Sequence, residues 1–337
     1  MITATKPPRF LIIQTAFIGD VILTTALLEQ IRAVQPDARL DVLVRKGNES
    51  LLAGHPLLNE VLTWDKKNAK YRDLWRILTF VRAQQYDVVL NLQRFGATGL
   101  LTALSNARLT VGFDKNPFSR FFTYRVDHRY EPGVHEVDRN AGLLAPLGVK
   151  GPRTRPKLYP SSDDYAVARS YQNKPYVCIA PTTVWFTKQY PPERWAELIQ
   201  VLPIDLTVYL LGAPTDLALC ETIRTLSGQE GRVVNLAGRM NLMRSAVLHA
   251  GAVMNYVNDS AALHLCSAMN APTTAVFCST VPQFGFGPLA DKSRVVQTPE
   301  PLSCKPCGVH GRTSCPLEHF RCAWGIRVSD LSLGDVH

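Results

Sequence analysis

Short apolar runs rich in β-branched residues alternate with longer amphipathic stretches along most of the 337-residue chain. No other sequence feature constrains the fold as strongly. Alternation of this kind is typical of a parallel sheet covered by helices on both faces, so we predict an α/β protein. In the first half of the chain, the strand-like runs lie at 10–15, 40–44, 87–92 and 109–113.

The alternation is interrupted after Gly148 by VKGPRTRPKLYPSSDD, a stretch rich in proline and basic residues, and then restarts. A chain of this length suits two domains of about 150 residues each, so we predict two doubly wound domains joined by a hinge at 149–166. The strand-like runs of the second half lie at 176–180, 206–212, 233–238, 252–257 and 273–278. The expected boundaries are 1–155 for the N-terminal domain, 165–320 for the C-terminal domain and 321–337 for a segment that packs back toward the N-terminal domain.

The composition and net charge of the chain indicate which kind of molecule it binds. The chain is 46% hydrophobic and 19% charged, which is ordinary for a globular protein. It has no apolar run of about 18 residues and no signal-peptide pattern in MITATKPPRF, so we expect a cytoplasmic protein. The net charge of +9 indicates an anionic partner. Because the basic residues are scattered rather than gathered in a run with interleaved aromatics, nucleic acid is not specifically indicated, and a phosphorylated substrate or an anionic membrane surface fits as well.

Ligands of doubly wound sheets bind at the carboxyl ends of the strands, and the first such end carries a carboxylate. AFIGDVILTTALL follows the first strand, with Gly19 and Asp20 at the start of a helix-like run. Asp20 has two interpretations. It caps the orphan amide groups of the helix, or it acts as a general base that takes a proton from a substrate hydroxyl.

A second strand end combines hydroxyls with a cation. PTTVWFTKQYPPERW, residues 181–195, places Thr182, Thr183, Thr187 and Lys188 between a strand and a helix. Hydroxyls, backbone amides and an ammonium group at such a junction favour phosphate binding, although the spacing is not that of a P-loop. The alternative is a polar loop with a solvated lysine.

A third strand end, NDSAALH at 258–264, offers Asp259 or Ser260 as the cap of a helix whose N-terminus favours an anion. His264 lies about one turn into that helix. It either contacts the anion or is a buried structural histidine.

Four of the eight cysteines, Cys304, Cys307, Cys315 and Cys322, fall in one loop-like segment. A structural zinc site, labile disulfides and unmodified loop thiols all remain open for this group. The other four cysteines lie in apolar stretches and are expected to be small buried hydrophobes.

The opening segment IIQTAFIGDVILTTALLEQIRAVQPDARLDVLV resembles that of the ADP-heptose:lipopolysaccharide heptosyltransferases, glycosyltransferase family 9. The resemblance continues through HEVDRNAGLLAPLG, TKQYPPERWAELI, VYLLGAPTD, NLAGRMNL and NDSAALHLCSAMNAPTTAVF, in the same order. It implies a GT-B fold of two Rossmann-like domains with a cleft between them. It also implies transfer of heptose with inversion, without a catalytic metal or a cofactor.

The resemblance assigns roles to individual residues. Asp20 matches the catalytic base of the family. The glycine usual in the family's D-[ST]-G element is Ala261 here, which leaves the identity of the sugar less secure than the reaction type. The residues matched to donor binding are Thr182, Thr183, Thr187, Lys188, Asp216, Met240, Asp259, Ser260, Ala261 and His264.

The family's acceptor is the acidic, often phosphorylated inner core of lipopolysaccharide, and the positive net charge of this chain would favour binding of such an acceptor. Peripheral contact with the anionic inner membrane from the cytoplasmic side is expected for the same reason. The residues expected to contact the acceptor are Lys46, Arg72, Arg94 and Arg120.

Three other functions remain as alternatives. The first is an inverting transferase that uses another nucleotide sugar, and the second is a nucleotide-sugar epimerase, a class that shares the GT-B fold. The third is a member that binds glycans without catalysis. An NAD oxidoreductase is disfavoured because the first strand–helix turn lacks GxGxxG.

Overall fold

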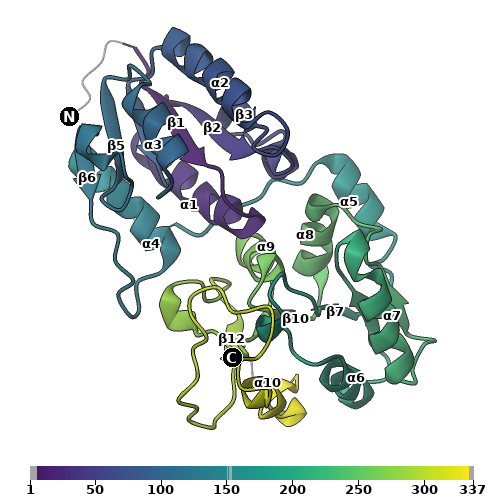
Figure 1. The fold of residues 1–337 in the computed structure, drawn as a ribbon. Coiled ribbons are helices and arrows are strands. Elements are labelled where there is room, and N and C mark those ends of the chain that lie inside the picture. The colour runs from purple at the N-terminus through teal and green to yellow at the C-terminus, as the bar shows by residue number, and fades with distance from the viewer. Residues whose placement is uncertain (1–5, 150, 152–153, 334–337) are drawn as a thin grey trace. The chain divides into compact units, whose positions relative to one another are not determined.

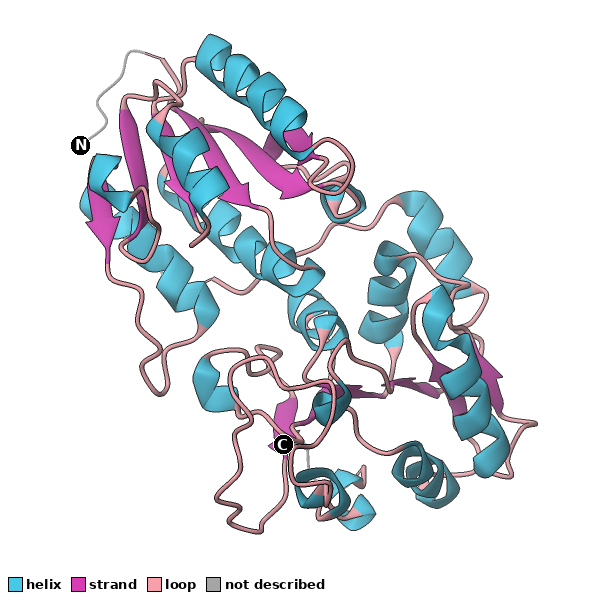
Figure 2. Cartoon of the chain, viewed as in Figure 1, coloured by secondary structure: helices cyan, strands magenta, loops and turns pink. Residues whose placement is uncertain are grey.

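The computed structural model describes residues 6–149, 151 and 154–333. The chain divides into two compact units, residues 1–159 and 160–337. Each unit contains a six-stranded sheet of parallel strands, with helices packed against the sheet (Figures 1 and 2). The predicted α/β class, with two doubly wound sheets, is confirmed.

The first sheet has the strand order β3-β2-β1-β4-β5-β6. The order reverses between β1 and β4, whose paired residues run from Phe10 opposite Val88 to Ile13 opposite Asn91. The strands are β1 (Arg9–Gln14), β2 (Arg39–Arg45), β3 (Leu58–Trp64), β4 (Val88–Asn91), β5 (Leu109–Phe113) and β6 (Tyr124–Val126).

Helices α2 and α3 pack together on one face of the first sheet, whereas α1 and α4 pack together on the other (Figure 1). Helix α2 buries Leu74, Ile77 and Leu78 against Leu11 and Ile13 of β1. The helices are α1 (Ile18–Val34), α2 (Lys70–Gln84), α3 (Gly96–Ala103) and α4 (Glu136–Ala141), with short 3-10 turns η1 (Glu49–Leu52), η2 (Ser119–Phe121) and η3 (Gly142–Leu147).

The second sheet repeats this topology, with the order β12-β11-β10-β7-β8-β9 and the reversal between β7 and β10. Its strands are β7 (Tyr176–Ala180), β8 (Thr207–Leu210), β9 (Val233–Asn235), β10 (Met254–Asn258), β11 (Thr273–Val276) and β12 (Ser293–Val296). Its helices are α5 (Ser162–Arg169), α6 (Pro192–Val201), α7 (Leu217–Leu226), α8 (Leu242–Gly251), α9 (Ala261–Met269) and α10 (Arg321–Trp324). Its 3-10 turns are η4 (Phe186–Lys188), η5 (Pro214–Asp216), η6 (Pro282–Phe284) and η7 (Val328–Leu331).

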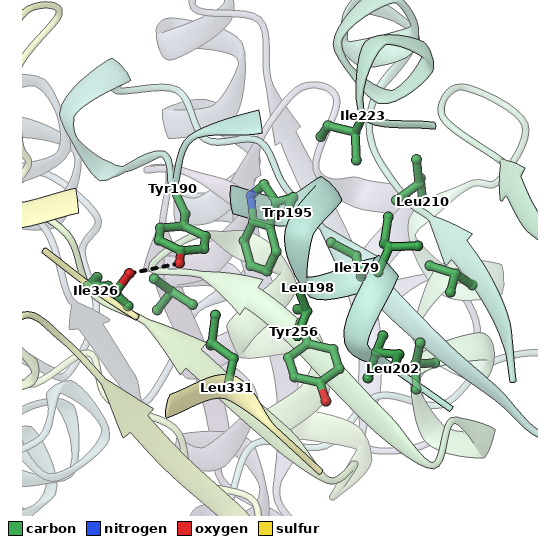
Figure 3. Packing of buried hydrophobic residues seen from close by; sticks show 14 of the residues in the cluster. Ile179, Tyr190, Trp195, Leu198, Leu202, Leu210, Ile223, Tyr256, Ile326 and Leu331 are labelled. Carbon is green, nitrogen blue, oxygen red and sulfur yellow. Dashed lines mark hydrogen bonds between the residues drawn. The ribbon is translucent and has the colours of Figure 1, made fainter. Parts of the chain in front are cut away.

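The largest buried side chains of the second unit lie between its sheet and α6 (Figure 3). Tyr190 and Trp195 meet edge to face with ring centroids 5.1 Å apart. The Tyr190 hydroxyl donates to the carbonyl of Ile326 at 3.0 Å, and Ile326 and Leu331 belong to the same core. The described residues of the expected 321–337 segment therefore contribute to the core of the second unit, while 334–337 lie outside the described residues.

The proline-rich connection between the two sheets follows α1 before it enters the second unit. Thr154 Oγ1 donates to the carbonyl of Ala26 at 2.6 Å, and the backbone N–H of Lys157 donates to Thr25 Oγ1 at 2.9 Å. Residues 150, 152 and 153 of the expected hinge lie outside the described residues. Among the helices of the described ranges, none is both long and apolar enough to cross a membrane.

Candidate functional site

Both sheets reverse their strand order at one point, and the carboxyl ends of the strands at such a switch point form the usual ligand site of a doubly wound fold. In the first unit these ends lead into the turn before α1 and into the loop that begins at Leu92. In the second unit they lead into the loop 181–191 and into the start of α9. Asp20, Lys188 and Asp259 all lie at these positions.

Asp20 occupies the first turn of α1, which begins at Ile18 with Phe17 as its N-cap. One carboxylate oxygen, Oδ2, accepts a hydrogen bond from the backbone N–H of Phe17 at 3.1 Å. The predicted capping role is therefore confirmed, although the helix begins two residues before Asp20. Negative charge in this turn also suits the positive end of the helix dipole.

The environment of Asp20 makes its carboxyl group a weaker acid than usual. Burial, together with the nearby Glu136 carboxylate, raises the pKa of Asp20 from 3.8 to about 6, while the Phe17 hydrogen bond and Arg45 oppose the change. Glu136 lies at the start of α4 and is paired with Arg139 at 2.8 Å. A carboxylate with a pKa near the working pH is suited to general base catalysis. Glu136 was not predicted from the sequence.

A basic pocket lies beside the α1 turn, at the carboxyl ends of β2 and β3. It has a volume of about 550 Å³. The Lys66 ammonium group donates to the carbonyl and the hydroxyl of Thr15 at 2.9 and 2.7 Å. Burial and the neighbouring cations Arg45 and Lys70 lower the pKa of Lys66 to about 8. The pocket is lined by Ile18, Arg45, Lys46, Gly47, Asn48, Asp65, Lys66, Lys67 and Asn68.

The four residues predicted to bind the acceptor do not line a single pocket. Lys46 and Arg72 share a second pocket of about 570 Å³, in which Lys46 is paired with Asp65 at 3.1 Å. Arg94 follows β4, and Arg120 lies over the ring of Phe121 at 4.7 Å. Of the four, only Lys46 lines the basic pocket next to α1.

In the second unit, Lys188 and Asp259 connect the two loops at the switch point. The Lys188 ammonium group and Asp259 Oδ2 lie 2.7 Å apart, with side chains only 14% and 7% exposed. The same carboxylate oxygen accepts a hydrogen bond from Thr280 at 2.7 Å. Asp259 therefore fixes Lys188 at the carboxyl edge of the sheet.

The predicted threonines divide into two roles. Thr182 Oγ1 donates to Asp216 Oδ2 at 2.9 Å, and the same oxygen accepts the backbone N–H of Ala213 at 2.7 Å. The structure thus brings Thr182 and Asp216 together. Thr183 caps its own turn, because its hydroxyl donates to the carbonyl of Trp185 at 2.6 Å.

Thr187 was expected to contact the donor, but its side chain is only 1% exposed. Its hydroxyl oxygen accepts hydrogen bonds from Ser279 Oγ at 2.9 Å and from the backbone N–H of Arg312 at 2.8 Å. Its own backbone N–H donates to the carbonyl of Arg312 at 3.1 Å. These contacts anchor the turn that carries Lys188 to the loop around Arg312.

The remaining donor candidates lie on neighbouring turns. Ala261 is the first residue of α9, with Ser260 as N-cap, and His264 is buried one turn further along. Met240 follows β9 and packs against the core. Gly238, with φ +73°, keeps the Met240 turn against Pro214, whose Cα lies 2.9 Å from the position of an added Cβ.

The four clustered cysteines line one cavity of about 260 Å³, together with Thr187 and His319. Cys304 Sγ and His319 Nε2 lie 4.0 Å apart, and burial raises the pKa of the Cys322 thiol to about 11. All eight cysteines are free thiols. Within the described ranges, no group of three or more His, Cys, Asp or Glu residues is arranged to hold a metal ion.

Comparison with known proteins identifies the family. Residues 74–316 match the model of glycosyltransferase family 9 (heptosyltransferase). The chain belongs to this family. It is therefore a glycosyltransferase, and the residues of the second unit that were predicted to bind the donor lie within the matched range, whereas Asp20 precedes it.

Individual relatives of this family 9 enzyme are distant in sequence but match over most of their length. The chain is 27% identical to lipopolysaccharide heptosyltransferase 3 of Escherichia coli, over 78% of this chain and 82% of that protein. It is also 27% identical to lipopolysaccharide heptosyltransferase 1 of Pseudomonas aeruginosa, over 93% of this chain and 90% of that protein. The structure of E. coli ADP-heptose lps heptosyltransferase II matches with a TM-score of 0.78 at 20% identity, over 96% of both chains. The fold is therefore GT-B.

Proposed function

We propose that this enzyme transfers heptose from ADP-heptose to the inner core of lipopolysaccharide, with inversion at the anomeric carbon. The names of its relatives support this acceptor class. A solved structure of E. coli heptosyltransferase WaaC with ADP-2-deoxy-2-fluoro heptose, a protein of the same fold, supports an ADP-linked donor. The observation that carries the proposal is the Asp20 carboxyl, with its raised pKa at the switch point of a family 9 chain.

The second unit, which contains the proposed donor domain 165–320, would bind ADP-heptose at the carboxyl edge of its sheet. Lys188 and the N-terminus of α9 supply positive charge where the leaving diphosphate gains negative charge, which is electrostatic stabilisation of the transition state. Thr182 and Asp216 share a hydrogen bond on the next turn, and both offer groups to the nucleoside. Met240 follows on the turn beyond and would flank the adenine.

The first unit, which contains the proposed acceptor domain 1–155, would hold the acceptor and the base. Asp20 accepts the proton of the acceptor hydroxyl as its oxygen attacks the anomeric carbon, and the bond from that carbon to the diphosphate breaks. Inversion requires attack from the face opposite ADP. The reaction therefore requires the hydroxyl bound by the first unit to reach the sugar bound by the second.

The basic pocket next to Asp20 suits a phosphorylated acceptor. Four cations and one carboxylate line it, and phosphate groups are recognised by such clusters. Arg45 and Lys66 thereby join Lys46 as proposed acceptor contacts. For such an acceptor we propose a cytoplasmic enzyme peripheral to the inner membrane, and the reaction as written uses no cofactor.

Two measurements test the proposal. The first compares thermal stabilisation by ADP, UDP, GDP and NAD, and we expect ADP to give the largest rise in Tm. The second measures transfer from ADP-heptose to a heptose-free inner-core acceptor, by mass spectrometry of the product. Stabilisation by UDP in place of ADP would overturn the donor assignment, and donor binding without transfer to any core acceptor would overturn the acceptor assignment.

A further inference from the structure

One face of the first unit exposes aromatic side chains that its core does not need. Helix α2 buries Leu74, Ile77, Leu78 and Val81 against the sheet, so its outward side is expected to be polar. Tyr71 and Trp75 lie there instead, with 68% and 62% of their surface exposed.

These rings border an apolar groove of about 330 Å³ between α2 and α3. Phe95 and Phe121, 62% and 56% exposed, lie near the start of α3, and Phe121 is 6.3 Å from Phe118 between ring centroids. We call this surface the aromatic face, defined by Tyr71, Trp75, Phe95, Phe118 and Phe121. The groove is lined by Lys70, Tyr71, Leu74, Trp75, Leu78, Gly96, Ala97, Leu100, Leu101 and Phe118.

The charges around the aromatic face are mostly positive. Lys70 lies over the ring of Tyr71 at 5.2 Å, and Arg120 lies over the ring of Phe121 at 4.7 Å. Asp73 on the same helix is neutralised by Arg76 at 2.6 Å. Aromatic rings mixed with lysine and arginine are the composition that favours the headgroup region of an anionic bilayer.

The aromatic face lies at the same edge of the sheet as Asp20. Helices α2 and α3 follow β3 and β4, so both begin at the carboxyl edge, where α1 also begins (Figure 1). Tyr71 and Phe95 lie at those helix starts. The chain passes directly from Lys66 and Lys67 in the basic pocket to Lys70 and Tyr71 at the groove.

We propose that the aromatic face docks this unit on the surface of an anionic phospholipid bilayer, with Tyr71 and Trp75 inserted among the headgroups and Lys70 paired with lipid phosphates. This inference rests on the proposed function, because an acceptor anchored in a membrane by acyl chains is reached only by an enzyme held at that surface. Docking by this face brings the basic pocket and Asp20 close to the sugars that project from the bilayer.

Binding is tested first, without donor or acceptor, by cosedimentation of the full chain with vesicles. Vesicles that contain phosphatidylglycerol should bind the enzyme, whereas vesicles of pure phosphatidylcholine should bind it at least tenfold less. Trp75→Ala with Tyr71→Ala, and separately Lys70→Glu, should each lower binding about tenfold. The matched controls are Trp324→Ala, an exposed tryptophan of the second unit, and Lys174→Glu, an exposed lysine there; both should bind normally.

Quenching by lipids brominated in the acyl chains locates the contact, and the quenching should disappear in Trp75→Phe. Transfer to a vesicle-borne acceptor should fall about tenfold in the Trp75 and Tyr71 double variant, with transfer to a deacylated soluble acceptor unchanged. Equal binding to both vesicle types, or equal losses in the control variants, would overturn the inference. So would a dimer in solution that Trp75→Ala dissociates, because the groove would then be an interface between copies. If the enzyme binds the vesicles but transfers no heptose, the docking proposal is supported and only the proposed function is refuted.

Discussion

Replacing Asp20 by Asn separates the role of its carboxylate in catalysis from its role in capping α1. Asn keeps an oxygen that accepts the Phe17 N–H but removes the base, so the helix start is preserved. A general base contributes about 10²–10⁴-fold to the rate, and we expect turnover to fall by that factor. The affinity for ADP should not change, because the residues proposed to bind the nucleotide belong to the second unit.

The raised pKa predicts the pH dependence of the wild-type enzyme. With a pKa of about 6, the Asp20 carboxyl is about 90% ionised at pH 7 and about 10% at pH 5, so kcat/KM should fall about tenfold between them. Glu136→Gln removes a negative charge that favours the protonated form, and it should move the acid limb to lower pH. Arg45→Gln removes a positive charge that favours the ionised form, and it should move the limb to higher pH.

The same pKa affects stability. The Asp20 carboxyl has a pKa of 3.8 when unperturbed and of about 6 in the folded protein, so the folded state binds more protons than the unfolded state between these pH values. The free energy of unfolding therefore decreases as the pH rises through this interval. The full difference corresponds to about 3 kcal/mol, which solvent screening at this partly exposed group reduces to about 1–2 kcal/mol. Asp20→Asn should therefore raise Tm at pH 7 while it lowers turnover.

These measurements need initial rates with a soluble acceptor over a range of pH, and thermal unfolding of each variant. Glu29→Gln, which changes a carboxylate on the same helix that accepts from Tyr159 at 2.6 Å, serves as the control and should leave the acid limb in place. Retention of wild-type turnover by Asp20→Asn would refute the assignment. An acid limb near pH 4, or one that Glu136→Gln and Arg45→Gln move in the same direction, would refute the electrostatic reasoning.

Four further changes test other parts of the site. Lys188→Ala leaves Asp259 buried without its cation, so it should destabilise the protein by about 3–5 kcal/mol. It should also weaken ADP binding more than tenfold, as measured by calorimetry. The control variant Lys174→Ala should have neither effect. Thr187→Val leaves the Arg312 N–H without its acceptor, costs about 1–3 kcal/mol and should raise KM for the donor more than it lowers kcat. Gly238→Ala places a Cβ 2.9 Å from Pro214 Cα at φ +73°, so it should lower stability by about 1–3 kcal/mol, whereas Gly231→Ala, which meets nothing within 4 Å, should not. Lys66→Ala should raise KM for a phosphorylated acceptor but not for its dephosphorylated form, and equal KM changes for the two would exclude a phosphate contact.

The sequence predicted the central strands well but missed three of the four edge strands. The runs predicted at 10–15, 109–113 and 176–180 lie within one residue of β1, β5 and β7, because central strands of parallel sheets are continuously apolar. β3, β6 and β12 were not predicted. β3 is exposed or half-buried at most of its residues, so its sequence shows neither a continuous apolar run nor a clear alternation.

The candidate site was predicted where its residues directly follow a strand and missed where packing assembles it. Asp20, Lys188 and Asp259 could be found because each follows a strand in the sequence. Glu136 affects Asp20 only because α4 packs against α1, more than a hundred residues away in the chain. Arg45 and Lys66 come together because β2 and β3 are neighbours in the sheet. Sequence spacing does not carry this information.

Each half of the chain has an aspartate at its strand-order reversal, Asp20 after β1 in the first sheet and Asp259 after β10 in the second, and the two have different surroundings. Asp259 forms an ion pair with Lys188 and accepts a hydrogen bond from Thr280. Its charge therefore fixes the Lys188 ammonium group where a diphosphate would bind. Asp20 accepts a backbone N–H from Phe17 and lies near the Glu136 carboxylate, and its pKa is raised. A carboxylate whose charged form is destabilised by burial and by a like charge is a better proton acceptor than an unperturbed one. These electrostatic differences support the proposal that Asp20 is the base and that Asp259 positions Lys188.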